Sequence, residues 1–80
     1  MNKAQQEILR VMANSHGPMS GREIVEASDV ITTRIVYAQA GELVESGHLS
    51  DEYAAEGNPP RRYFYLTPKG RNAVDYEIET

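Results

Sequence analysis

The segment that decides the fold is "GNPPRRYFYLTPKG", residues 57–70. It joins a turn-forming cluster, two adjacent arginines and an aromatic run to the start of a helix. Thr67 and Pro68 have the form of a helix N-cap followed by proline at the first helical position. Before the turn cluster and after it, side chains alternate with a period of two. This pattern predicts a β-hairpin over about residues 48–66, followed directly by a helix.

Successive side chains of a strand point to opposite faces of the sheet. We therefore expect Phe64 and Leu66 to face the core of the protein, with Tyr63 and Tyr65 on the other face. The hairpin thus supplies one apolar face, which other elements of the chain must cover.

Two helices are predicted at the start of the chain. Apolar residues at helical spacing predict the first over residues 3–13. The second, over about residues 21–28, begins at a capping box in which Ser20 and Glu23 satisfy each other's free backbone N–H groups. Both helices are short and each has a distinct end.

A third helix is predicted over about residues 32–46, with Thr32 as its N-cap and Gly47 as the left-handed residue just past its end. Only "SDVI", residues 28–31, separates it from the second helix, and two capped helices joined by so tight a turn predict a helix-turn-helix. A last helix is expected over residues 68–78. The order helix, helix, helix, hairpin, helix predicts an α+β fold of the winged helix-turn-helix type, with three helices, a β-hairpin wing and a short C-terminal helix.

Length and composition limit the classes of function. The 80 residues are expected to form a single domain, residues 1–80, with a small core that is marginal unless the protein dimerises. The chain has no cysteine, His16 and His48 are isolated, and no catalytic triad or phosphate-binding loop is visible. We therefore expect no enzyme, no metal and no cofactor, and so short a chain leaves little room for a small-molecule ligand. No apolar run could span a bilayer or serve as a leader, so a cytoplasmic protein without a membrane partner is expected.

Charge is distributed unevenly along the chain. The formal net charge is −4, whereas nucleic-acid-binding domains are usually basic. Residues 61–71 nevertheless hold four of the eight lysines and arginines and no acidic residue. A local concentration of this kind can steer an anion even on an acidic molecule.

Two segments resemble a known family. "RRYFYLTPKG", residues 61–70, is similar to the wing and following helix of PadR-family transcriptional regulators. "IVYAQAGELVESGHL", residues 35–49, resembles the recognition helix of that family, with Tyr37 at the position of the family's tyrosine. About ten residues follow Gly70 where the family has long dimerisation helices, so the chain is expected to be a minimal PadR-like domain.

The resemblance implies a homodimeric regulator that binds double-stranded DNA, expected to be a repressor. Its third helix would enter the major groove, and its wing would lie on the backbone or in the minor groove. The first and last helices are the expected dimer surfaces, because their apolar residues exceed what so small a core can hide.

Residues at the start of the third helix and on the wing are the candidate DNA contacts. The N-terminal part of a recognition helix contacts base edges, and Arg34 has the chemistry to read guanine through a bidentate pair. At the hairpin tip, Arg61 and Arg62 point to opposite faces, so one of them is expected to reach the duplex fully. Lys69 lies in the first turn of the last helix, where a cation opposes the helix dipole, which suggests a phosphate partner. The predicted DNA-binding residues are Arg22, Thr32, Thr33, Arg34, Tyr37, Arg61, Arg62 and Lys69.

A second class of function stays open at this stage. The same residues could form an ordinary solvated helix face and the charged edge of a strand that blocks aggregation. The winged helix would then be a protein–protein interaction module, such as a phage or plasmid antirepressor or adaptor, that does not bind DNA. The net charge, Glu42 and Glu45 on the third helix, and the acidic tail favour this alternative.

Overall fold

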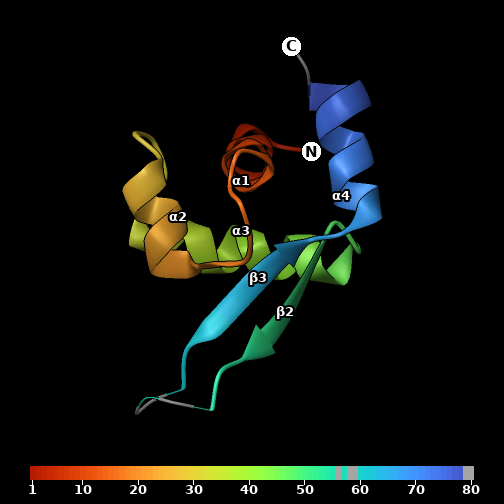
Figure 1. Cartoon of the computed structure of the whole chain (residues 1–80). Coiled ribbons are helices and arrows are strands. Elements are labelled where there is room, and N and C mark those ends of the chain that lie inside the picture. The colour runs from red at the N-terminus through yellow and green to blue at the C-terminus, as the bar shows by residue number, and fades with distance from the viewer. Residues whose placement is uncertain (56, 58–59, 79–80) are drawn as a thin grey trace.

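The computed structural model describes residues 1–55, 57 and 60–78, and it confirms the predicted order of helices and hairpin (Figure 1). Pro59 of the proline pair and the last two residues lie outside this part of the chain. The elements are α1 (Lys3–Ala13), β1 (Met19–Ser20), α2 (Gly21–Ala27), α3 (Thr33–Glu45), β2 (Leu49–Tyr53), β3 (Arg62–Leu66), α4 (Pro68–Ala73) and the π-helical turn η1 (Val74–Ile78).

Helix α1 lies at the centre of the domain, with α2, α3 and α4 around it (Figure 1). It begins at Asn2, whose side chain forms a capping box with Gln5 that the sequence analysis did not identify. Because neighbours surround it, α1 buries Ile8, Leu9 and Met12 in the core. Its residues Ala4 and Val11 are only partly buried. The expectation that α1 takes part in a dimer surface stays a prediction.

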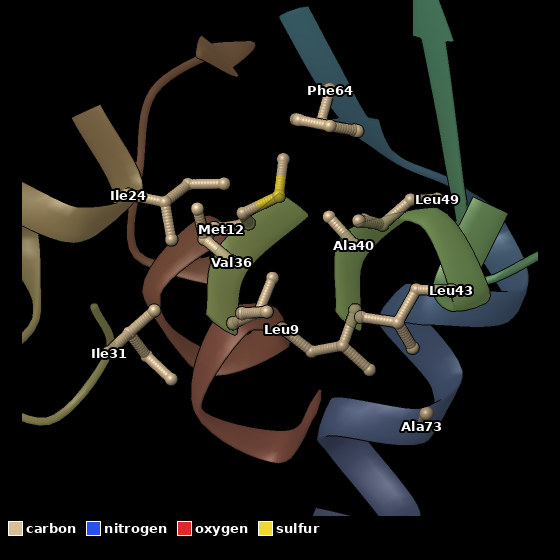
Figure 2. Packing of buried hydrophobic residues seen from close by; sticks show 11 residues of the cluster. Leu9, Met12, Ile24, Ile31, Val36, Ala40, Leu43, Leu49, Phe64 and Ala73 are labelled. Carbon is tan, nitrogen blue, oxygen red and sulfur yellow. The ribbon is translucent and has the colours of Figure 1, made fainter. Parts of the chain in front are cut away.

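A single apolar cluster joins the helices to the hairpin, as Figure 2 shows. Phe64 is fully buried, as the strand alternation predicted, and Leu66 packs against the cluster from the same strand. Burial of apolar side chains contributes roughly 1.5–3 kcal/mol for each large residue, so this cluster dominates the stability of the domain. The buried members are Ile8, Leu9, Met12, Ile24, Ile31, Val36, Ala40, Leu43, Leu49, Phe64 and Ala73.

The sheet has three antiparallel strands in the order β1-β3-β2. Strands β2 and β3 form the predicted hairpin, in which Leu49 pairs with Leu66 and Tyr53 pairs with Arg62. Strand β1 was not predicted, because two residues are too short to show a period. Its residue Ser20 also begins α2 as the predicted N-cap, with Ser20 N donating to Glu23 Oε1 at 2.8 Å.

The last helix differs in detail from the prediction. Thr67 caps it and Pro68 occupies its first turn, as expected. The sequence pattern predicts Val74 and Ile78 on one apolar stripe of this helix. The buried residues are instead Gly70 and Ala73, and Val74 packs only at the edge of the core. From Val74 the helix widens to a π-helical turn, which shifts the periodicity that the sequence analysis assumed. The side chain of Ile78, also assigned to that stripe, lies outside what the structure describes.

Candidate nucleic-acid interface

The start of α3 presents polar side chains to solvent. Val36 and two further residues at helical spacing are buried against the core, so the opposite side of the helix is free. Thr32 caps the helix by accepting from Ile35 N, and Thr33 and Arg34 follow as exposed residues. Arg34 makes no ion pair or side-chain hydrogen bond with any residue that the structure describes. Its guanidinium is therefore available to an external acceptor.

The two adjacent arginines of the wing differ in their surroundings. Arg62 Nε lies 2.7 Å from Asp51 Oδ2, and its guanidinium carbon lies 4.7 Å from the centre of the Phe64 ring. Its side chain is only 25% exposed, so Arg62 is held against the sheet. Arg61 is exposed and has no ion-pair partner among the described residues. Of the two, Arg61 is the one free to reach another molecule.

An open groove of about 850 Å³ separates the helix-turn-helix from the wing. It brings together four of the predicted contact residues, which come from α2, α3 and the wing: Arg22, Tyr37, Arg61 and Arg62. Tyr53 also lines the groove, and it is not among the predicted DNA-binding residues. Its position opposite Arg62 in the hairpin register is the signal that could have identified it. Thr32, Thr33, Arg34 and Lys69 do not line the groove.

Acidic residues also line this groove, so its charge is mixed. Glu26 accepts from Arg22 Nε at 3.3 Å, but both side chains are highly exposed. Exposed pairs of this kind contribute about 0.2–1 kcal/mol, and such a pair separates easily when a better partner is near. Glu23, by contrast, is occupied as the partner of Ser20 in the capping box of α2.

Lys69 has an internal role in the structure. Its Nζ donates to Ser46 O at 2.7 Å, at the C-terminal end of α3. A cation near the C-terminus of a helix is stabilising, because the last carbonyl groups carry partial negative charge. The unfavourable position of Lys69 in α4 is thus explained by its contact with α3, and a phosphate is not needed to account for it.

The outer face of the wing carries a second polar pair. Tyr65 Oη donates to Glu52, and this hydrogen bond to a carboxylate raises the pKa of Tyr65 above its ordinary value. Tyr65 therefore stays protonated and neutral at physiological pH.

Over the described residues, no group of three or more His, Cys, Asp or Glu side chains could hold a metal ion. Within the same part of the chain, no helix has the length and apolar character needed to cross a membrane.

Comparison with known proteins shows which fold this is. No family model matches the sequence, and neither does any curated protein. Among solved structures, Bacillus subtilis PadR in complex with operator DNA matches with a TM-score of 0.82 and 17% identity, over 100% of this chain and 49% of that one. The chain thus spans about half the length of PadR.

Two further structures match over most of this chain. The reduced form of the B. subtilis transcriptional regulator YodB has a TM-score of 0.73 and 21% identity, over 90% of this chain and 68% of that one. A MarR-family protein from Porphyromonas gingivalis W83 has a TM-score of 0.75 and 22% identity, with the same shares covered. At these identities the similarity establishes the fold, which is the winged helix-turn-helix shared by these regulators.

Proposed function

We propose that this protein is a DNA-binding transcriptional regulator that acts as a homodimer, with repression as its expected mode. Helix α3 enters the major groove, and the wing lies on the backbone or in the minor groove. The observation that carries the proposal is the exposed start of α3, where the side chains of Thr33 and Arg34 make no hydrogen bond or ion pair within the described part of the chain. Polar side chains at that end of a recognition helix are the ones that reach base edges.

The wing supplies the second part of the interface. Arg61 is exposed at the groove between the wing and the helix-turn-helix, where Arg22 approaches from α2. Phosphate contacts from arginine fix the orientation of a protein on the duplex, while contacts to the bases specify the sequence. The division of labour is therefore base reading by Arg34 and backbone binding by Arg22 and Arg61. The PadR structure with operator DNA supports this arrangement, because the two folds superpose over the whole of this chain.

Dimerisation would use the last helix. Tyr76 is 83% exposed there, an unusual state for a large aromatic side chain, whereas Ile8, Leu9 and Met12 of α1 are buried within the domain. Two copies would present two recognition helices and two wings. A symmetric pair of this kind reads two half-sites about one helical turn of DNA apart.

One of the acidic residues that favour a protein–protein interaction module has an internal hydrogen bond. Glu42 accepts from Gln5 Nε2 at 3.1 Å, so it is turned toward α1 and away from the exposed start of α3. Glu26 remains as an exposed acidic group that lines the groove, whereas Glu45 is exposed at the opposite end of α3 from Arg34. Because of these acidic groups, the alternative of a protein–protein interaction module is tested in the same experiment.

The test is the double variant Arg34→Ala with Arg61→Ala, measured for binding to random-sequence duplex DNA at low salt. We expect its affinity to fall by at least about thirtyfold, because each arginine contributes roughly 1–3 kcal/mol and about 1.4 kcal/mol is a factor of ten. The matched control is the double variant Lys3→Ala with Arg10→Ala. It removes the same charge from α1, the helix that packs against α3 on the side away from the proposed DNA contacts. Equal weakening by both doubles, or no binding by the unmodified protein, would contradict the proposal and favour a protein partner.

A further inference from the structure

Gly21 and Tyr37 lie in direct contact, although 16 positions separate them in the sequence. Gly21 is the first residue of α2 and is buried. A β-carbon added there would lie 2.6 Å from Cζ of Tyr37 and 2.7 Å from both Cε1 and Oη. Non-bonded carbon atoms prefer separations of about 3.5–4.0 Å, so no side chain fits at this position while the Tyr37 ring stays where it is.

The backbone does not require glycine at this position. Positive φ angles occur among the described residues only at Gly47 and Gly57. Gly21 has a conformation that any residue adopts, and glycine lowers the stability of a helix relative to alanine. The contact with the Tyr37 ring is therefore the feature that distinguishes this glycine.

The ring held by this contact belongs to the groove. Tyr37 is 44% exposed and lines the groove together with Arg22, Arg62 and Tyr53. A phenol hydroxyl donates well to a phosphate oxygen, and tyrosine is among the side chains that bind the DNA backbone. The position of the Tyr37 ring thus decides whether its hydroxyl faces a DNA strand that runs along the groove.

We propose that Gly21 is a positioning residue that acts through Tyr37: by lacking a side chain, it lets the Tyr37 ring lie across the start of α2 and face the DNA backbone. This inference rests on the proposed function. Alanine at Gly21 would displace the ring and leave α2 in place, because the atoms it meets are the far end of a flexible side chain. Gly21→Ala would therefore weaken DNA binding without destabilising the fold.

The premise is testable without DNA. In the NMR spectrum of the unmodified protein, nuclear Overhauser effects should connect the Gly21 α-protons to the Tyr37 ring protons. In Gly21→Ala the ring resonances should shift while the amide resonances of α2 and the core stay close to their original positions. An unmoved ring, or widespread changes through α2, would overturn the inference.

The functional step is tested by a double-mutant cycle on binding to random-sequence duplex DNA at low salt. Gly21→Ala and Tyr37→Ala should each weaken binding about tenfold, the loss expected for one hydrogen bond to a charged group. The double variant should be no weaker than Tyr37→Ala alone, because Gly21 acts only through the ring. Gly17→Ala is the matched control, since a β-carbon there meets nothing within 4 Å, and it should bind normally.

The possible failures differ from one another. If Gly21→Ala binds as well as the unmodified protein, or weakens binding equally in the Tyr37→Ala background, the positioning role is overturned and the proposed function stands. If the unmodified protein does not bind the duplex at all, the proposed function fails, and this inference fails with it.

Discussion

The two ends of α3 differ in what their polar groups contact. At the C-terminal end, the backbone oxygens are bound within the domain. Lys69 Nζ donates to Ser46 O, and Thr67 Oγ1 donates to Gly47 O at 2.6 Å and to His48 O at 2.9 Å. These bonds join α3 to β2 and to the start of α4.

At the N-terminal end, the helix is satisfied only locally. Thr32 caps it, while Thr33 and Arg34 extend into solvent and make no side-chain bond with a described residue. One helix thus serves two purposes. Its C-terminal end fixes the position of α3 in the domain, and its N-terminal end is left available for a partner. Substitutions at the end should therefore change stability, and substitutions at the start should change DNA binding.

The largest effect is expected at the fixed end, from Gly70→Ala. A β-carbon at Gly70 would overlap the carbonyl oxygen of His48 and lie 2.8 Å from Cδ1 of Leu66. The His48 oxygen belongs to the backbone and is already bound by Thr67, so it cannot move away at low cost. We expect a loss of about 3 kcal/mol or more in the free energy of unfolding, measured by chemical denaturation.

The control for this variant is Gly17→Ala, where a β-carbon meets nothing within 4 Å. Its stability should change by less than about 0.5 kcal/mol. A loss below about 1 kcal/mol for Gly70→Ala would mean that the junction of α4 with β2 is looser than this structure implies.

A matched pair of threonines compares the two ends directly. Thr67→Val removes an N-cap that also donates to Gly47 O and His48 O, and should cost about 1–2 kcal/mol of stability. Thr33→Val makes the same chemical change at the free end and should alter stability by less than about 0.5 kcal/mol. Only the second should weaken duplex binding. The reverse pattern would invalidate the assignment of the two ends.

Gly41→Ala should stabilise the protein by up to about 1 kcal/mol, because glycine is a poor helix former and an added β-carbon meets nothing within 4 Å. Gly41 lies on the exposed side of α3, two turns after Arg34. If DNA approaches the helix closely there, the same variant should bind the duplex less tightly. Thermal or chemical unfolding checks the first effect, and a change in stability of the opposite sign would contradict it.

The smallest effect concerns Lys69. Lys69→Met removes a charge from the C-terminal end of α3 and should cost about 0.3–1 kcal/mol, with the difference shrinking at high salt. Because Lys69 is held by Ser46 O and does not line the groove, duplex affinity should change little. A loss of affinity as large as that of Arg61→Ala would instead support the phosphate contact predicted from the sequence.

The sequence predicted the elements of this fold well where local signals dominate. The capping box of Ser20 and Glu23, the N-cap at Thr67 and the left-handed Gly47 all depend on residues a few positions apart, and all are present. The period of two likewise identified the hairpin and the burial of Phe64. These features are encoded in short segments.

The contacts that were missed join residues far apart in the chain. Strand β1 exists because Met19 pairs with Phe64, and the central position of α1 buries Leu9. The roles of Lys69 and Gly21 depend on α3 lying beside both residues. A one-dimensional pattern carries no information on such neighbours, so the sequence identified candidate DNA contacts but did not distinguish the free arginine of the wing from the bound one.

The most direct test of the central claim is a salt titration of binding to random-sequence duplex DNA, with the oligomeric state followed in parallel. A dimer that binds through phosphate contacts should lose affinity linearly with the logarithm of salt concentration, with a slope of about −0.9 for each contact. Arg61→Ala should reduce the slope by about 1 for each wing that contacts a phosphate through this residue. No binding at low salt, or affinity that does not depend on salt, would contradict the account and indicate a protein partner.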